Sequence, residues 1–397
     1  ACNPDIFEGF LDIEHGGMNA VYADLYAITG EKRYMDVSRR FNHQKVILNI
    51  ADGHDVLYGR HANFQTPTFE GTARQYQLTG DEVSRKATEN FLDMVYNGHI
   101  NCIGGNSCYE RFGIPGETTK RLGYTSSETC NTYNMLKVAL NTFESGGDLR
   151  HMDYFERALY NHILASQDPE TGGVTYYTST IPGGFKTYSD RFNLQGVWCC
   201  VGTGMENHSK YGEAIYFNNG NVLYVNLFIP STLDWEEKRL KLRQETDFPQ
   251  TDRTTLTVEE SGDYTAPIYL RYPHWAEKGV RVSVNGERIA VNGKPGQYIA
   301  INHPWQKGDR IEVEMPQTWR LEAAKDDPYM NAICRGPIVY AGILGNGHMP
   351  VDRVNGAGNN NRVVPENDIP TFIADKTDLD NWIKPTVTKA GNYRLVF

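Results

Sequence analysis

A short phrase that recurs at an interval of about 50 residues places the strongest limit on how this chain folds. Each copy ends a helical pattern with a glycine and continues with an acidic residue. The copies are Tyr26-Ala-Ile-Thr-Gly30-Glu31, Tyr76-Gln-Leu-Thr-Gly80-Asp81 and, in degenerate form, Phe143-Glu-Ser-Gly146 followed by Asp148. Glycine commonly ends a helix, and an acid favours the start of the next one. The repeat therefore indicates stacked helical hairpins.

Apolar spacing predicts about seven helices in the first half of the chain. We expect them at residues 17–29, 31–50, 66–79, 81–98, 128–145, 149–167 and 204–217. Long loops separate them at 52–65, 99–127 and 168–203. Because loops of this length in a compact domain are usually functional, we expect a site among them.

The pattern changes from helical to β-type after Asn218. Short runs such as 222–229 and 280–284 are punctuated by Asn-Gly pairs, which favour hairpin turns. We therefore predict a mainly α chain followed by β: a helical domain over 1–218 and an antiparallel β-sandwich over 219–344. The Asn-, Asp- and Pro-rich residues 345–397 are expected to form an irregular surface segment that returns to the sandwich.

Composition narrows the classes of partner. A net charge of −10, with acids spread evenly, argues against nucleic acid. No apolar run approaches the ~20 residues of a membrane span. Aromatic residues make up 12% of the chain, which suits either a sugar-binding cleft or a tyrosine-rich core. The seven cysteines are odd in number and irregularly spaced, unlike a disulfide framework.

One candidate metal-ligating fragment is Ser126-Ser127-Glu128-Thr129-Cys130. A serine here is a plausible helix N-cap, which places Glu128 and Cys130 in the first turn, where the helix dipole favours anions. Residues two apart diverge within a regular helix, so joint metal coordination requires the irregular geometry of a helix end. The alternative is that Glu128 only complements the dipole and Cys130 is a buried apolar residue.

The second fragment is the adjacent pair Cys199-Cys200, before a helical pattern that starts near Met205. The pair is open to three interpretations: metal ligands, a vicinal disulfide or two packing residues. Glu110, in the loop that follows Gly104-Gly105, is either a functional acid or an ordinary loop carboxylate. From the residues alone, a mixed Cys/Glu metal site with an acid beside it is one interpretation among these.

Longer motifs in the chain resemble glycoside hydrolase family 146 and its relative family 127, the β-L-arabinofuranosidases. The resemblance rests on the runs Glu128-Thr-Cys-Asn-Thr-Tyr-Asn-Met-Leu-Lys137, Glu156-Arg-Ala-Leu-Tyr-Asn-His162 and Trp198-Cys-Cys-Val-Gly-Thr-Gly-Met-Glu-Asn-His208, with shorter matches at Glu14–Asn19, Gly105–Ser107, Arg271–Ala276 and Arg335–Tyr340.

The resemblance implies an (α/α)6 barrel followed by β-sandwich modules, and a Zn²⁺ site. By resemblance, the zinc ligands are Glu128, Cys130, Cys199 and Cys200. Cys199 is implied as the nucleophile and Glu110 as the general acid/base. The sugar pocket is expected to be lined by His15, His61, Glu156 and Tyr177.

The implied function is that of a zinc-dependent, retaining exo-glycosidase, a β-L-arabinofuranosidase acting on plant-type arabinose-containing glycans. Two alternatives are a hydrolase of the same scaffold for another branched or acidic sugar, and a non-catalytic carbohydrate-binding protein in which zinc staples loops. The loop 111–125, with Gly113-Ile-Pro-Gly116 and Lys120-Arg121, differs from the histidine-containing family 146 version and bears on substrate preference. Since a six-hairpin barrel has more helices than the sequence pattern predicts, we expect this chain to be the C-terminal portion of a longer polypeptide, or to be accompanied by further N-terminal helices.

Overall fold

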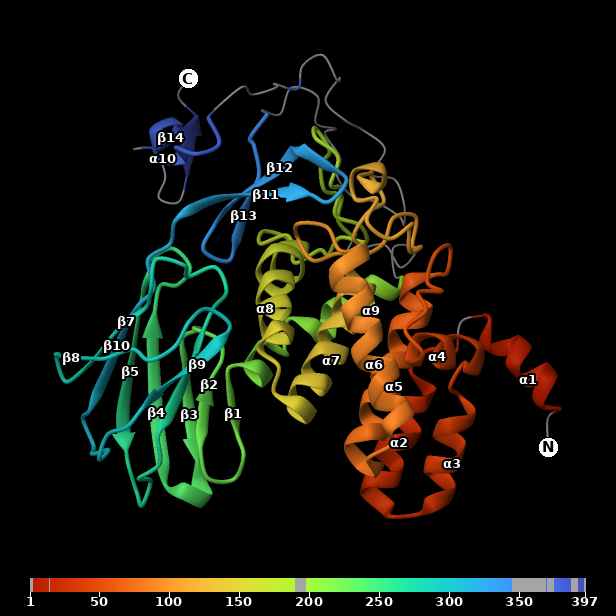
Figure 1. Cartoon of the computed structure of the whole chain (residues 1–397), viewed down its shortest axis with the longest axis horizontal. Coiled ribbons are helices and arrows are strands. Elements are labelled where there is room, and N and C mark those ends of the chain that lie inside the picture. The colour runs from red at the N-terminus through yellow and green to blue at the C-terminus, as the bar shows by residue number, and fades with distance from the viewer. Residues whose placement is uncertain are drawn as a thin grey trace. The chain divides into compact units, whose positions relative to one another are not determined.

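The computed structural model describes residues 3–13, 15–189, 198–344, 369, 375–386 and 392–395. Their contacts divide the chain into two units. The first contains residues 1–208, 323–331 and 342–370, and the second contains 209–322, 332–341 and 371–397. Helices build the first unit and strands the second (Figure 1), so the predicted helical part followed by antiparallel sheets is confirmed. No helix among the described residues is long and apolar enough to cross a membrane.

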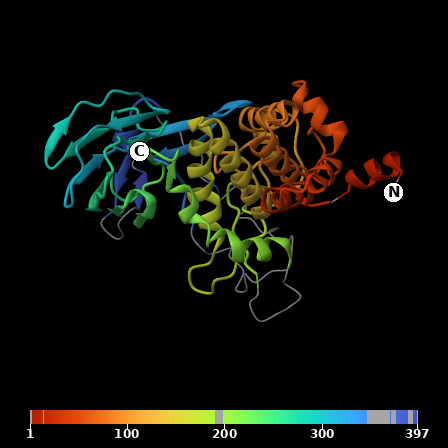
Figure 2. The same ribbon diagram turned by 90° about the horizontal axis from the view of Figure 1, so that it is seen from below.

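The first unit consists of helical hairpins. Its α-helices are α1 (Pro4–Leu11), α2 (Met18–Thr29), α3 (Lys32–Arg40), α4 (Gln44–Ala51), α5 (Ala62–Thr79), α6 (Glu82–Met94), α7 (Thr129–Gly146), α8 (Leu149–Ala158) and α9 (Cys199–Asn207). Shorter helical segments are η1 (Val95–His99), η2 (Thr119–Arg121), η3 (Leu159–Ile163) and η4 (Leu164–Ser166), whereas η6 (Tyr211–Ala214) belongs to the second unit. Helix α7 packs between α5 and α8, so that the three helices lie side by side in space (Figures 1 and 2).

The repeated phrase forms the hairpin turns as predicted. Gly30 and Gly80 take left-handed φ values of 72° and 68°, and each ends its helix by donating its N–H to a tyrosine carbonyl four residues back. In the third copy the left-handed glycine is Gly147, with φ 73°, and not Gly146. The helix pairs α2–α3, α5–α6 and α7–α8 are therefore built on one local device.

Some helix bounds differ from the prediction. The expected helix over 31–50 is broken into α3 and α4, because Asn42 turns inward between them. Its amide accepts a hydrogen bond from Asn19 at 3.0 Å and donates one to Gln75 at 2.9 Å. Helix α5 starts at Ala62 and not at residue 66. Helix α9 starts at Cys199, so the cysteine pair opens the helix instead of preceding it.

Helix α5 lies at the centre of the first unit and contacts α2, α6 and α7. Phe69 stacks on Phe91 of α6 with ring centroids 3.9 Å apart, and both rings are fully buried. Gly71 lets α2 approach closely, because a Cβ there would overlap the Asn19 amide. This core holds the start of α5, and hence His61, in place.

The second unit contains β1 (Tyr216–Asn218), β2 (Leu223–Val225), β3 (Ser231–Trp235), β4 (Leu240–Thr246), β5 (Arg253–Glu260), β6 (Ile268–Tyr272), β7 (Arg281–Val284), β8 (Glu287–Ile289), β9 (Gln297–Ile301) and β10 (Arg310–Glu314). Its sheets have the orders β1-β2-β6-β9 and β3-β4-β5-β10-β7-β8. Pairing is antiparallel except between β2 and β6, which are parallel. Along β5, buried residues such as Leu256 and Val258 alternate with more exposed ones, as a half-buried strand requires.

The next strands are β11 (Trp319–Ala324), β12 (Asp327–Arg335) and β13 (Ile338–Tyr340), with β12 paired to β13. Residues 323–331, around the turn between β11 and β12, belong to the helical unit. Most of the expected surface segment 345–397 lies outside the described residues, as do Glu14 and residues 190–197. Its described parts contain α10 (Leu379–Trp382) and the pair β14 (Ile383–Pro385) and β15 (Tyr393–Leu395).

Candidate metal centre and active site

Four predicted ligands from two helix starts converge in the first unit. One donor atom from each of Glu128, Cys130, Cys199 and Cys200 lies within 4.8 Å of all the others. The Sγ atoms of Cys130 and Cys200 are 2.9 Å apart, and Cys199 Sγ lies 3.8 Å from a Glu128 carboxylate oxygen. Cys199 is exposed, whereas the other three are buried. The fold thus joins fragments that spacing alone could not connect.

The start of α7 allows Glu128 and Cys130, which are two residues apart, to direct their side chains to one place. Glu128 is the N-cap and has an extended backbone, and Cys130 is the second residue of the helix. The two residues are therefore not both in regular helix, and their side chains can point to the same place. Ser127 precedes them with a left-handed φ of 54°. The Thr129 N–H donates to the Tyr176 carbonyl at 3.0 Å, which ties this helix start to residues 176–177.

The cluster fits a metal ion. One Glu128 oxygen is buried and has no hydrogen-bond partner among the described residues, and burial raises the pKa values of Glu128 and Cys200 well above their ordinary range. Several buried acids without counter-charge are costly, and a divalent cation removes that cost. The Thr203 hydroxyl donates to Cys130 Sγ at 3.5 Å, as an outer hydrogen bond to a metal ligand does.

Glu110 stands on a tight turn from Cys108 to Arg111. Each of these two end residues donates its N–H to the carbonyl of the other at 3.1 Å. The central residues, Tyr109 and Glu110, both have left-handed φ values, 50° and 61°. This is the conformation that Asn-Gly normally supplies. For larger residues it costs roughly 1–2 kcal/mol each, so the surrounding contacts must hold the turn in place.

The Glu110 carboxylate has three hydrogen-bond partners. His61 Nε2 lies 3.1 Å from one oxygen, and the Tyr177 hydroxyl donates to the other at 2.8 Å. The hydroxyl of Tyr176 donates to that second oxygen as well. The hydrogen bond from His61, followed by those from the two phenols, outweighs burial and lowers the pKa of Glu110 to about 2. Glu110 is therefore ionised at neutral pH in this arrangement.

His61 reaches Glu110 because it caps α5. The backbone N–H of the next residue, Ala62, donates to the Glu110 carbonyl at 2.7 Å, so the helix start and the turn are fixed to each other. The imidazole stacks on Phe64 with centroids 3.7 Å apart. His61, an expected sugar-pocket residue, thus contacts the expected acid/base directly.

Sequence reasoning missed Tyr176. Its hydroxyl lies 3.8 Å from Cys199 Sγ while it donates to Glu110, and its ring centroid is 5.9 Å from that of Trp198. The only signal in the sequence was its position beside Tyr177. Neighbouring side chains in extended chain normally point to opposite faces, so one of the pair would be expected to face away.

For two predicted residues, no described hydrogen bond joins them to this group. His15 Nε2 is 3.1 Å from the Thr68 hydroxyl, and Glu156 is a buried residue of α8. Neither belongs to the four-donor cluster. Their proposed part in binding sugar stays a prediction.

Solved structures of glycoside hydrolases share this fold. One, titled simply a glycoside hydrolase, has 20% sequence identity and a TM-score of 0.68 over 80% of this chain and 59% of its own. A GH127 β-arabinofuranosidase has 23% identity and a TM-score of 0.69, with 81% and 55% covered. A GH127 β-L-arabinofuranosidase from Geobacillus stearothermophilus has 22% identity and a TM-score of 0.65, over 81% of this chain and 57% of its own. No curated protein matches the sequence.

The family itself is given by the sequence. Residues 3–213 match the model of the β-L-arabinofuranosidase GH127 catalytic domain, and residues 222–317 match the GH127 middle domain. The chain therefore belongs to glycoside hydrolase family 127, and that part of the predicted resemblance is confirmed. It spans between 55% and 59% of the length of the three solved proteins.

Proposed function

We propose that this protein is a zinc-dependent retaining exo-glycosidase of the β-L-arabinofuranosidase type, acting on plant-type arabinose-containing glycans. The observation that carries the proposal is the placement of Glu110 and Cys199 on either side of one phenol, that of Tyr176. Retaining hydrolysis uses a nucleophile and an acid/base beside the same anomeric carbon. The GH127 match supplies the substrate class, since its description names β-L-arabinofuranosidase.

Zinc is the metal that best suits the donors. Three thiols and one carboxylate form a soft, four-coordinate set typical of Zn²⁺. In a tetrahedral site with Zn–S bonds of ~2.3 Å, neighbouring sulfurs lie ~3.8 Å apart. The sulfur–sulfur distances of 2.9 Å between Cys130 and Cys200 and 4.0 Å between Cys199 and Cys200 lie on either side of that value. When bound, zinc supplies the positive charge that keeps cysteine deprotonated at neutral pH.

Cys199 is assigned as the nucleophile because it is the exposed member of the cluster. From the protein groups alone, without a metal, hydrogen bonds from the Cys130 and Cys200 thiols lower the pKa of Cys199 well below its ordinary value. Its sulfur forms a bond to the anomeric carbon as the bond to the leaving oxygen breaks. Water then displaces the sulfur, which restores the thiolate and retains the configuration.

Glu110 moves the proton in both halves of this cycle. It donates a proton to the leaving oxygen and later takes one from the attacking water. Because its pKa is low, Glu110 is ionised, and the ionised form is the one that the second half requires. In the first half the pKa must rise, which requires a bound sugar to weaken the hydrogen bond from His61. His61 and the two tyrosines hold the carboxylate in its orientation at other times.

The surroundings of Glu110 also favour an enzyme over a non-catalytic binding protein. A zinc site that only staples loops has no need of a carboxylate outside its ligand set. Here Glu110 takes a costly backbone conformation and receives three side-chain hydrogen bonds. The same-scaffold hydrolase for another branched or acidic sugar stays open, because no described contact selects the sugar.

A substrate panel with metal analysis on the same sample tests the proposal. Synthetic aryl furanosides and pyranosides in both anomeric forms are assayed, and the sample is measured for metal by elemental analysis. We expect release of β-L-arabinofuranose with retained configuration and one zinc per chain. Turnover of a different sugar would leave the mechanism standing and replace the substrate. Zinc without turnover of any glycoside would favour the binding protein.

A further inference from the structure

The turn that carries Glu110 is held from behind by the side chain of Arg121. One guanidinium nitrogen, Nη2, donates to the carbonyl oxygen of Arg111. That oxygen also accepts the Cys108 N–H at 3.1 Å, which is one of the two hydrogen bonds that close the turn. Arg121 therefore binds the turn at its closing point, one residue after Glu110.

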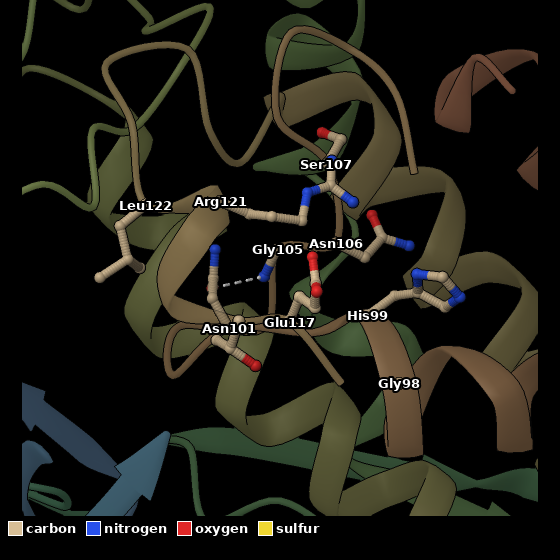
Figure 3. Close-up of a pocket in the computed structure, with 10 residues that line it drawn as sticks. Gly98, His99, Asn101, Gly105, Asn106, Ser107, Glu117, Arg121 and Leu122 are labelled. Atoms are coloured by element: carbon tan, nitrogen blue, oxygen red, sulfur yellow. Dashed lines mark hydrogen bonds between the residues drawn. The ribbon is translucent and has the colours of Figure 1, made fainter. Parts of the chain in front are cut away.

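No other contact among the described residues explains why the Arg121 side chain is buried. It forms no ion pair with any described acid, and its Nη1 is buried without a hydrogen-bond partner there. Burial lowers the pKa of Arg121, the sign of a cation that has lost water without gaining a carboxylate. Figure 3 shows the side chain extending across a small recess toward Asn106 and Ser107. A cation in so costly a position points to a functional constraint.

The sequence leaves room for this guanidinium at Gly113. A Cβ added to Gly113 would overlap Nη1, Cδ and Cζ of Arg121. No left-handed φ requires glycine at this position. Glycine is therefore needed for space, and the space it leaves is filled by Arg121.

A distant residue fixes the short helix that carries Arg121. Both carboxylate oxygens of Asp326 accept the Thr119 N–H at 3.0 Å, and one also accepts the Thr119 hydroxyl at 2.8 Å. Thr119 is the first residue of η2 and Arg121 its last. Asp326 lies in the stretch 323–331 that belongs to the helical unit, so this contact lies inside one unit.

We propose that Arg121 and Asp326 are positioning residues for Glu110. Asp326 anchors η2, and Arg121 on η2 clamps the carbonyl of Arg111. The clamp keeps the left-handed turn closed, with the Glu110 carboxylate aimed at the reacting bond. Neither residue transfers a proton or touches the sugar. The inference rests on the proposed function for its effect on turnover, and on the described contacts alone for its effect on the turn.

Four variants test the clamp at its separate points: Arg121→Ala, Arg121→Lys, Gly113→Ala and Asp326→Asn. The first readout needs no activity. Hydrogen–deuterium exchange is measured on the peptide that spans the turn, whose Cys108 and Arg111 amides are protected by the closing hydrogen bonds. We expect faster exchange there in Arg121→Ala, Gly113→Ala and Asp326→Asn, and wild-type exchange at the C-terminal end of α5, where no hydrogen bond to the turn is described.

The second readout is kinetic. For a substrate with a poor leaving group, Arg121→Ala should lower kcat by about tenfold to a hundredfold with KM little changed, as a misplaced catalytic group does. A substrate with an activated leaving group should lose less. Added methylguanidine should restore part of the kcat of Arg121→Ala, and Arg121→Lys, which keeps a donor, should retain more activity than Arg121→Ala.

Matched controls lie next to each residue. Lys120→Ala removes the neighbouring exposed cation, which pairs with Glu117, and Asp327→Asn removes the neighbouring acid. Both should match wild type in turn exchange and kcat. If Arg121→Ala is misfolded, Arg121→Lys and Asp326→Asn decide the matter.

Unchanged turn exchange in Arg121→Ala and Gly113→Ala would overturn the inference, and so would a loss confined to KM, which indicates sugar binding. A wild-type protein without glycosidase activity would overturn the proposed function instead. The exchange comparison would still decide whether the clamp exists.

Discussion

The hydroxyl of Tyr176 lies 3.8 Å from the sulfur of Cys199. The same hydroxyl donates to Glu110, so one phenol sits between the proposed nucleophile and the proposed acid/base. The phenol donates its proton to the carboxylate, and its oxygen also contacts the sulfur. Tyr176 thereby fixes the spacing of two groups that come from segments far apart in the sequence.

Tyr176→Phe should lower kcat by roughly tenfold to a hundredfold, the range for a lost hydrogen bond to a charged group. It should also change the rate at which iodoacetamide labels Cys199, because the phenol next to the sulfur is gone. Tyr177→Phe is the matched control, since the Tyr177 hydroxyl also donates to Glu110. Equal labelling rates in both variants would show that Tyr176 does not act on Cys199.

Glu110→Gln should slow turnover by roughly two to four orders of magnitude, the range for a lost general acid. Glu110 is not a proposed ligand, so zinc content should stay at the wild-type level. Substrates with activated leaving groups should lose less, because they need little protonation. The comparison is made with Glu117→Gln, which removes a carboxylate paired with Lys120. Full activity of Glu110→Gln with zinc in place would exclude it as the acid.

Metal removal should inactivate and destabilise the protein, because the buried carboxylate and thiols lose their counter-charge. Dialysis against a chelator should lower Tm, and added zinc should restore both Tm and turnover. Glu128→Gln should reduce zinc content, since it removes the one oxygen donor. A haloacetyl furanoside should label Cys199 and spare Cys130 and Cys200, as mass mapping of the tryptic peptides would show. Wild-type zinc content in Glu128→Gln would remove it from the ligand set.

A buried histidine away from the site, His151, should make the folded protein less stable as the pH is lowered. Burial lowers the pKa of His151 from 6.5 to about 4, and its Nδ1 lies 3.2 Å from the Tyr96 hydroxyl. The folded protein holds the His151 ring in its neutral form. The contribution of this ring to the free energy of unfolding is therefore complete above pH 6.5 and is lost as pH falls toward 4. The loss is roughly 3 kcal/mol when it is complete.

Urea unfolding of wild type and His151→Gln, at pH 7.5 and at pH 4.5, measures this contribution. Glutamine does not titrate, so the free-energy advantage of wild type over the variant should shrink at the lower pH. Other buried histidines, such as His162, are present in both proteins and cancel in the comparison. An advantage that is the same at both pH values would contradict the assignment.

The sequence predicted the features of the fold that depend on neighbouring residues. The hairpins at Gly30 and Gly80 follow from a local helix-ending signal, and the structure has them. The break between α3 and α4 depends on amides of α2 and α5 that reach Asn42 from elsewhere in the chain. No local pattern records such a contact.

The site also combines features that depend on neighbouring residues with contacts between distant parts of the chain. Spacing could not join Glu128 and Cys130 to Cys199 and Cys200, and only the family resemblance indicated that they belong together. Tyr176 escaped notice because its part depends on the path of the chain around the cluster. Arg121 stood out only as a departure in the loop, and its contact with the turn needed the fold.

The left-handed pair at Tyr109 and Glu110 has a consequence for engineering. A chain selected for stability alone would place Asn-Gly at these two positions, where positive φ is least costly. Glycine at the second position would remove the carboxylate of the proposed acid/base, whereas the first position carries an exposed tyrosine, Tyr109. We therefore expect Tyr109→Asn to raise Tm while the carboxylate at the next position is left in place.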